Sequence, residues 1–328
     1  MPLGHALSLT GTKSRARSCD MDNPYDSCPT PVLFLIQRRP DLTARVLAAI
    51  RSARPAHLML AADGPEEDDR CQETRRLVLD GIDWPCQVHT RFSPTRLGCR
   101  EAISQALDWG FALHERLIVV EDDCLPELSF FRFCTELLDR YQDDEKIMQI
   151  CGSNLSGHAA QDGSSYYASR FDTIWGWASW RRAWQKHDGK LASWPAVCSS
   201  AAWRQSCRFK GEQSWRRQLY DSAYSGGLDA WSVAWMYAKE KHGGLALIAS
   251  NNLVSNLGWG EDATHTHDQN DPRACMKTVP VEFPLRHAKN LVPDDRADLN
   301  YFIRFCRAPS LASRVINKLY RIWRQMWA

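Results

Sequence analysis

The stretch Leu117-Ile118-Val119-Val120-Glu121-Asp122-Asp123 runs from four apolar residues directly into three carboxylates. An unbroken, mostly β-branched apolar run is typical of a strand that is covered on both faces. The acids therefore follow the carboxyl end of a buried strand, where open α/β sheets bind their ligands. Carboxylate oxygens there suit Mg²⁺ or Mn²⁺, which usually binds one or two carboxylates together with substrate phosphates. Alternatively, the acids form only the first turn of a helix over residues 126–141.

Strands and helices alternate through the first half of the chain. Strands are predicted over residues 31–37, 58–62, 87–92 and 117–120, and helices over 41–52, 68–79, 98–114 and 126–141. This order predicts an α/β fold with a mostly parallel, Rossmann-like central sheet and helices on both faces. Because parallel strands end on one edge of a sheet, we expect the loop at Asp63 to open beside the three acids. After Ile150 the pattern is less regular and rich in tryptophan.

Composition excludes several classes of protein. Lys and Arg number 41 against 39 for Asp and Glu, so the net charge of +2 argues against a general nucleic-acid binder. The 12 cysteines show no close pair, which favours reduced thiols in a cytosolic protein. No run of 18 or more apolar residues occurs, which excludes a membrane-spanning helix. Residues 1–29 are expected to be a disordered lead, because their basic residues precede no apolar stretch.

Several short motifs follow one another between Pro31 and Thr266. They are Pro31-Val-Leu-Phe-Leu-Ile, Arg39-Pro40-Asp41-Leu42-Thr43, Ala62-Asp63-Gly64-Pro65, Leu97-Gly98-Cys99-Arg100, Val120-Glu121-Asp122-Asp123-Cys124-Leu125-Pro126, Phe130-Phe131, Ile174-Trp175-Gly176-Trp177-Ala178-Ser179-Trp180-Arg181 and Leu253-Val254-Ser255-Asn256 continuing to Thr266. In this order they resemble the GT-A-type nucleotide-sugar glycosyltransferases, and among these bacterial proteins similar to the N-acetylglucosaminyltransferase I family. The resemblance implies one large GT-A-type domain. Its parts would be a nucleotide-sugar-binding half (30–150), an acceptor-binding half (151–290) and a C-terminal amphipathic helical extension (291–328).

The resemblance also implies residues that bind the donor nucleotide. Asp63 would accept hydrogen bonds from the base or ribose, although an ordinary Asp-Gly turn explains it equally. Gly98 would let the backbone approach the donor closely. Arg100, in the first turn of its helix, would hold a phosphate together with the helix N-terminus, unless it forms a surface ion pair.

The same resemblance gives roles to the acids and to two tryptophans. Glu121 and Asp122 would face the ribose and the donor sugar, and Asp123 would bind the divalent ion. Trp175 and Trp177 would form an apolar wall beside a sugar ring, with packing in the core as the alternative.

A transfer with inversion needs a base that takes the proton from the acceptor hydroxyl. In the resemblance this base lies beside a tryptophan, but here Ser232 follows Trp231, so the role passes to Asp229, to Glu261 or Asp262, or to no residue. A further departure is Arg96, where relatives tend to have asparagine. His265 is a further candidate to bind the metal or a phosphate. Alternatively, it is a solvent-exposed loop histidine without a functional role.

Residues 310–327 carry apolar residues at helical spacing with basic residues between them. This pattern predicts a basic amphipathic helix, which either docks on the domain or lies on an anionic membrane. The sequence thus predicts a glycosyltransferase that uses Mn²⁺ or Mg²⁺ and moves a hexosyl or N-acetylhexosaminyl group from a nucleoside diphosphate sugar to a glycan or lipid-linked glycan. Its expected location is the cytoplasm, with possible peripheral contact with the inner face of the membrane. The alternatives are a relative that binds nucleotide sugar or glycan without transfer, as Ser232 suggests, and a metal-dependent phosphohydrolase.

Overall fold

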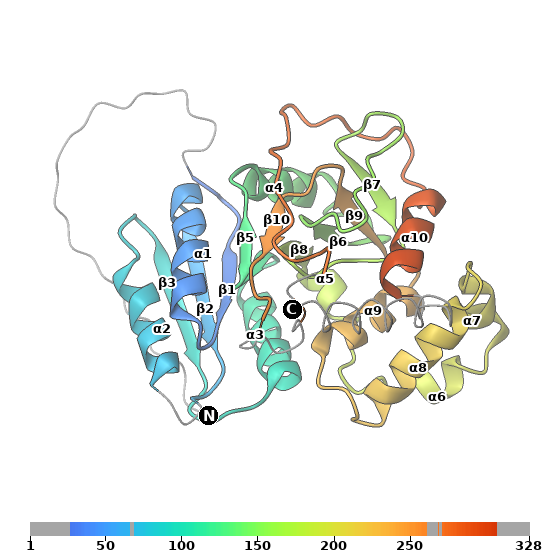
Figure 1. Ribbon diagram of the computed structural model, residues 1–328, viewed down its shortest axis with the longest axis horizontal. Coiled ribbons are helices and arrows are strands. Elements are labelled where there is room, and N and C mark those ends of the chain that lie inside the picture. Colours follow the sequence, from blue (N-terminus) through green and yellow to red (C-terminus); the bar gives the residue numbers. More distant parts are fainter. Residues whose placement is uncertain (1–26, 66–68, 261–267, 269–270, 307–328) are drawn as a thin grey trace, which may run out of the picture.

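A central sheet of eight strands organises the computed structural model, which describes residues 27–65, 69–260, 268 and 271–306 (Figure 1). In spatial order the strands are β3 (Gln87–Phe92), β2 (His57–Ala62), β1 (Val32–Ile36), β4 (Arg116–Glu121), β8 (Trp177–Trp180), β6 (Ile147–Cys151), β9 (Leu245–Ala249) and β7 (Tyr166–Ser169). The four strands β3, β2, β1 and β4 pair in parallel, as do β6 and β9. β8 is antiparallel to β4 and β6, and β7 is antiparallel to β9. Of these eight strands only β8 and β7 run against the rest, so the predicted α/β class with a mostly parallel sheet is confirmed.

The first-half elements lie close to their predicted positions. The helices are α1 (Pro40–Ala53), α2 (Arg70–Asp80), α3 (Cys99–Leu113) and α4 (Ser129–Arg140). The four apolar residues before Glu121 are fully buried, as expected for a strand covered on both faces. After the acids, the chain enters β5 (Cys124–Pro126), which pairs with β10 (Val254–Asn256), and α4 begins only at Ser129. The acids therefore do not form the first turn of the following helix, and that alternative is wrong.

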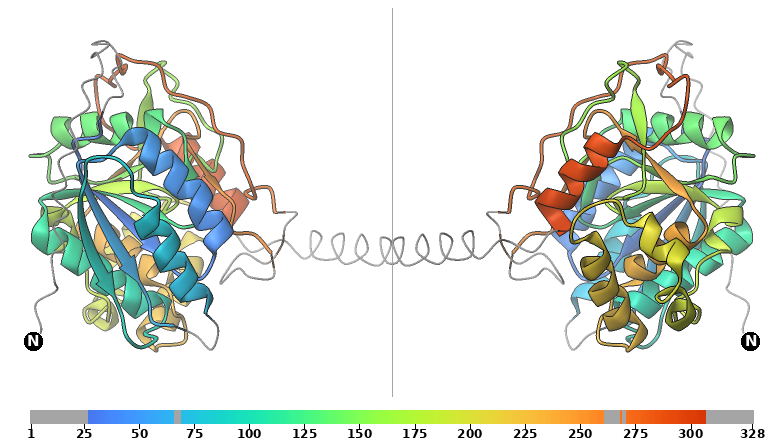
Figure 2. Two further views of the ribbon diagram at one scale, coloured as in Figure 1. Left: turned by 90° about the vertical axis from the view of Figure 1, so that its left-hand side faces the viewer. Right: turned by 90° about the vertical axis from the view of Figure 1, so that its right-hand side faces the viewer.

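Helices cover both faces of the sheet. One core cluster joins alternate residues of β1, β2 and β4 to α1, α2 and α4. The other face packs against α3, α5 (Arg181–Trp184) and α9 (Trp231–Lys241). Figure 2 shows α1 and α2 side by side on their face of the sheet. Because β4 pairs with β8, the sheet and its cores run through both predicted halves of the chain.

Many of the tryptophans lie in a helical layer beyond the sheet. The helices α6 (Trp194–Val197), α7 (Ala201–Ser206) and α8 (Glu212–Tyr224) gather next to α9 (Figure 1). Trp194, Trp203, Tyr220 and Tyr237 form an aromatic core there, with edge-to-face ring pairs about 5 Å to 6 Å apart. This cluster accounts for two of the tryptophans after Ile150, and Trp177, Trp184, Trp231 and Trp235 pack on the α3 face of the sheet.

The C-terminal part of the described chain returns to the sheet. Helix α10 (Asp295–Tyr301) and the π-helix over Phe302–Cys306 pack beside β7 and α8. Within the described ranges no helix has the length and apolar character that a membrane span requires. Every cysteine in those ranges is a free thiol. Most of the predicted lead (1–26) and the predicted basic amphipathic helix (310–327) lie outside the described residues.

Candidate active site at the carboxyl edge of the sheet

A cavity of about 1040 Å³ opens where the parallel strands end. Its wall is built from the ends of β1, β2, β3 and β4, the N-terminus of α3 and the start of α9. This volume is at the upper end of the range of small-molecule sites, and its position is the one expected for the ligand of an open α/β sheet. The lining includes five arginines and five carboxylates: Arg38, Arg39, Arg91, Arg96, Arg273, Asp63, Glu121, Asp122, Asp123 and Asp229.

Arg39 holds two of the three acids at the end of β4. Its Nη1 donates to Asp123 Oδ2 at 2.7 Å, and its Nη2 forms an ion pair with Asp122 Oδ1. The backbone N–H of Gln37 donates to the other Asp122 oxygen at 3.0 Å. Arg39 belongs to one of the sequence motifs, but its role could not be predicted, since its partners are 83 and 84 residues away along the chain. The only local signal is an arginine directly before the proline that opens α1.

Glu121 brings an uncompensated oxygen to this group. Its Oε1 is buried and has no hydrogen-bond partner among the described residues. Burial raises the pKa of Glu121, and the charges of Asp123 and Asp122 raise it further, whereas Arg39 acts in the opposite direction. Burial likewise raises the pKa of Asp122 against the effect of Arg39. These buried carboxyls therefore ionise less readily than free ones, and a cation bound beside them would stabilise their charged forms.

These acids fit a divalent ion that is shared with a ligand. Among the described residues, Asp123 Oδ1 accepts a 3.3 Å hydrogen bond from the Cys124 thiol, a weak donor, and Glu121 Oε1 accepts none. The three acids do not, however, form a set of three closely spaced ligand atoms in the described residues. Mg²⁺ or Mn²⁺ bound through Asp123 and Glu121 would therefore take further ligands from water or phosphate.

Gly258 allows the chain after β10 to approach Asp123. Leu257 N–H donates to the Asp123 carbonyl at 2.7 Å, and Gly258 N–H donates to Asn256 Oδ1 at 2.9 Å. A Cβ on Gly258 would lie 2.0 Å from Asp123 Oδ2. Glycine is therefore required here by space.

Asp63 organises the loop that leads into α3. Its carboxylate accepts backbone N–H groups from Gly64 at 2.7 Å, Leu97 at 2.8 Å and Gly98 at 3.0 Å. Because a carboxylate has about four acceptor positions, little capacity is left for a nucleotide. Asp63 does line the cavity, and its contact with a base or ribose stays a prediction.

Asp229 caps α3 from a distant part of the chain. Its Oδ2 accepts the N–H of Cys99 at 3.1 Å, and its Oδ1 accepts the N–H of Arg100 at 3.0 Å. Gly98 has φ of 87°, and a Cβ there would lie 3.1 Å from Asp229 Oδ2. The absence of a side chain at Gly98 leaves room for Asp229, and close approach of this backbone to a donor stays a prediction. Arg100 lies in the first turn of α3 as expected, but its side chain is not part of the described cavity wall.

The two predicted sugar-binding tryptophans have different positions. Trp175 lines the cavity, with the edge-to-face ring of Trp259 5.9 Å away. Trp177 is fully buried in β8 and stacks on Trp231 at 5.6 Å. The prediction for Trp177 is wrong, because no face of its ring reaches the cavity, and packing in the core explains it. Trp175 remains a candidate sugar contact.

Three further predicted residues, Glu261, Asp262 and His265, lie outside the described residues. Ser232 is described and lines the cavity beside Trp231 at the start of α9. Of the candidate bases, Asp229 is thus the one that the structure places in the cavity.

No protein-family model matches this chain, and no curated protein sequence does. Among solved structures, the chain is similar to a cytidylyltransferase from Leptospira borgpetersenii serovar Hardjo-bovis (8% identity, TM-score 0.31, 48% of this chain and 63% of that one). It is also similar to a UDP-glucose pyrophosphorylase complexed with UDP-glucose (15%, 0.28, 43% and 62%) and to mouse xyloside xylosyltransferase 1 (10%, 0.32, 64% and 81%). The chain spans less than two thirds of the first two proteins. Similarity at this level identifies neither a family nor a substrate.

Proposed function

We propose that this protein transfers a sugar from a nucleoside diphosphate sugar to a glycan or glycoconjugate acceptor with the help of Mn²⁺ or Mg²⁺. The observation that carries the proposal is the composition of the cavity at the carboxyl ends of β1, β2 and β4. It combines the partly uncompensated acids Glu121 and Asp123 with several arginines and the ring of Trp175. Such a wall suits a ligand with a cation-bound diphosphate at one end and a sugar at the other.

The roles of the residues follow from their positions. Asp123 and Glu121 would hold the ion, which supplies Lewis-acid stabilisation of the charge on the leaving diphosphate. Arg39 would keep Asp123 in place. Asp229 would accept the proton of the acceptor hydroxyl, since each of its oxygens has a second acceptor position beyond the bond to α3. Trp175 would pack against a sugar ring.

The finer assignments depend on the family resemblance. These are the hexosyl or N-acetylhexosaminyl donor, inversion at the anomeric carbon and an acceptor that is a glycan or lipid-linked glycan. Peripheral contact with the membrane would come from the basic sequence of residues 310–327. Sedimentation with anionic vesicles, compared between the full chain and a chain ending at residue 307, tests that contact.

One observation favours a second candidate, a protein that binds nucleotide sugar or glycan without transfer. Both Asp229 oxygens accept backbone N–H groups of α3, which is the work of a structural cap. Ser232 stands where the resemblance expects an acid, and a serine hydroxyl is not a base at neutral pH.

A thermal-shift screen of nucleoside diphosphate sugars, with and without Mn²⁺, tests binding. We expect one donor to raise the melting temperature only when Mn²⁺ is present. Asp123→Asn should lose this shift, whereas the control Asp80→Asn, at the exposed end of α2, should keep it. An equal shift in Asp123→Asn would reject the metal assignment.

Product analysis with the same donor separates the function classes. Release of nucleoside diphosphate together with a glycosylated acceptor supports transfer. Binding without turnover supports the second candidate, and release of inorganic phosphate from the donor supports a phosphohydrolase.

A further inference from the structure

Three histidines meet on the α3 face of the sheet, away from the acids. His57 is the first residue of β2, His89 lies within β3, and His114 directly follows α3. In the parallel register His89 is opposite Met59, two residues after His57, so the two strand histidines project from the same face. Met59 packs in the core cluster of α3, which places this face under the helix that delivers His114.

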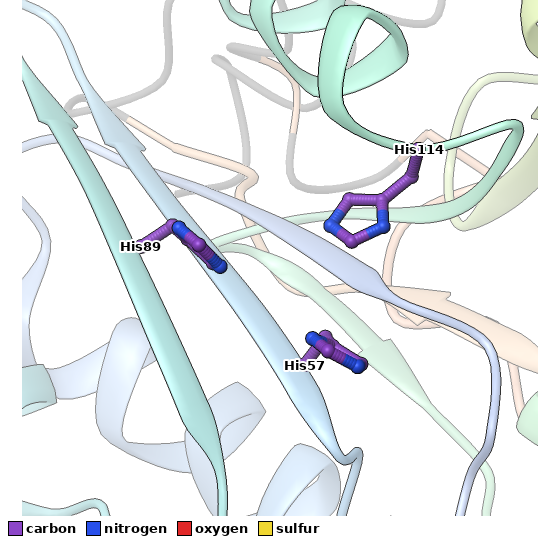
Figure 3. Close-up of side chains that lie close together, drawn as sticks. All are labelled: His57, His89 and His114. Carbon is purple, nitrogen blue, oxygen red and sulfur yellow. The ribbon is translucent and has the colours of Figure 1, made fainter. Parts of the chain in front are cut away.

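The three imidazoles surround one common space. One ring nitrogen of each lies within 4.8 Å of those of the other two. The ring of His114 lies 5.4 Å from that of His57 and 6.3 Å from that of His89, edge to face in both cases. Figure 3 shows the three side chains converging from two adjacent strands and from the end of the helix. Zinc with bonds of about 2.0–2.1 Å holds tetrahedral ligands roughly 3.3 Å apart, so closing the site would shorten each nitrogen separation by at most roughly 1.5 Å.

Two ring nitrogens of these histidines are buried without a hydrogen-bond partner among the described residues. Nδ1 of His57 and Nε2 of His114 have no hydrogen bond within the part of the chain that the structure describes. A buried polar atom of this kind costs free energy unless it is paired. Coordination of a metal ion through these two atoms would satisfy both. The guanidinium of Arg181 acts against a cation at His114, but it is itself ion-paired with Glu115.

This histidine cluster is separate from the candidate active site. His57 begins β2, whereas Asp63, which lines the cavity, directly follows the end of that six-residue strand. His114 follows the carboxyl end of the 15-residue helix α3, and Cys99 at its other end lines the cavity. A helix of that length spans roughly 22 Å. An ion held by the histidines therefore would not be the ion bound by Asp123.

We propose that His57, His89 and His114 form a site for a divalent transition-metal ion, with Zn²⁺ as the first choice, that links β2 and β3 to the end of α3. Neutral imidazoles suit Zn²⁺, Ni²⁺, Cu²⁺ and Co²⁺ rather than the hard ions Mg²⁺ and Mn²⁺. Three protein ligands leave a fourth position for water. Because the ligands come from three elements, the ion cross-links this end of the sheet and stabilises the folded chain.

The experiment uses the full chain without a histidine tag, freed of metal and titrated with Co²⁺. The visible absorption of Co²⁺ reports coordination geometry, and strong near-ultraviolet bands would reveal binding by cysteine thiolates instead. We expect one equivalent to bind with nitrogen-type spectra and to raise the melting temperature, and Zn²⁺ to displace it. His57→Gln, His89→Gln and His114→Gln should each weaken binding by at least about tenfold.

His242→Gln is the matched control, because His242 is exposed at the end of α9. It should bind Co²⁺ like the wild type. Circular dichroism identifies the variants that fold. If His114→Gln does not fold, the double variant His57→Gln/His89→Gln gives a second test of the site. Unchanged Co²⁺ binding in folded variants, or a wild type that binds no Co²⁺, would overturn the proposal. The three histidines would then only pack against one another.

Discussion

Arg39 is the side chain on which the acidic edge of the cavity depends. Its two nitrogens bind Asp122 and Asp123, and Asp122 is only 2% exposed. A buried carboxylate that loses its cation is strongly destabilising, since the charge remains without compensation. Arg39 thus contributes both to stability and to the position of the predicted metal ligand.

We expect Arg39→Gln to lower the free energy of unfolding by about 2–4 kcal/mol, somewhat less than for a fully buried pair because Arg39 is partly exposed. Urea denaturation measures the change. Adding Asp122→Asn should recover part of the loss, because it removes the unpaired charge. Arg51→Gln, which breaks the exposed pair with Asp83, should change little. Equal losses in Arg39→Gln and Arg51→Gln would contradict this role.

Asp229 is the residue that separates the two candidate functions. If it is the base, Asp229→Asn should lower the turnover number by roughly 10²- to 10⁴-fold while donor affinity stays nearly unchanged. Steady-state kinetics with the donor found by the screen measures both quantities. Ser232→Ala, which alters another residue of the cavity wall, should retain most of the activity. Full activity in Asp229→Asn would show that this carboxylate serves only to cap α3. The role of the base would then pass to Glu261 or Asp262.

The segment that follows β10 packs directly against Asp123, a residue of the candidate active site. Gly258→Ala would place a methyl group 2.0 Å from Asp123 Oδ2, so the carboxylate must move. We expect Mn²⁺-dependent donor binding to weaken by at least about tenfold and the free energy of unfolding to fall by about 1–3 kcal/mol. Thermal shift and urea denaturation measure these effects.

The matched control for this change is Gly189→Ala. A Cβ there would meet only His187, at an ordinary 3.5 Å, so neither quantity should change much. If Gly258→Ala binds donor as the wild type does, Asp123 does not need its observed position.

Local pattern predicted the elements that follow regular periodicity. The run before Glu121 became β4, because burial of apolar residues decides such a segment. The predicted strand over 87–92 has the observed bounds of β3, although its residues are exposed or half-buried. Contacts between distant residues could not be predicted. Asp229 reaches the N-terminus of α3 across about 130 residues, and Trp177 lies in the core because β8 inserts antiparallel between β4 and β6. Nothing in the sequence near these residues specifies those pairings.

The histidine cluster is a further contact between distant residues that the sequence could not predict. His57, His89 and His114 are spaced 32 and 25 residues apart, far from any compact metal-binding motif. Only the register of β2 with β3 and the length of α3 bring them together.

In the whole molecule, the buried carboxylate of Asp298 joins α10, near the C-terminal end of the described chain, to the edge strand β7 of the sheet. Asp298 is fully buried, accepts the hydroxyl of Ser169 at 2.6 Å and lies 3.1 Å from Arg170. Burial raises the pKa of Asp298 to about 6, against the effects of Ser169 and Arg170. The folded state therefore holds this proton more tightly than the unfolded state does.

The sign of the pH dependence follows from that raised pKa. The contribution of Asp298 to stability is fully present below its unfolded pKa near 3.8 and is lost as pH rises through about 6. A shift of about two pKa units corresponds to at most about 3 kcal/mol. Asp298→Asn cannot titrate, so the wild type should lose stability relative to this variant between about pH 3.8 and pH 6. Urea denaturation of both proteins across that range measures the difference. Asp80→Asn, which alters an exposed carboxylate at the end of α2, should follow the wild type. A wild type that instead gains stability relative to Asp298→Asn as pH rises would mean that Arg170 and Ser169 outweigh burial, and that α10 is held by an ionised carboxylate.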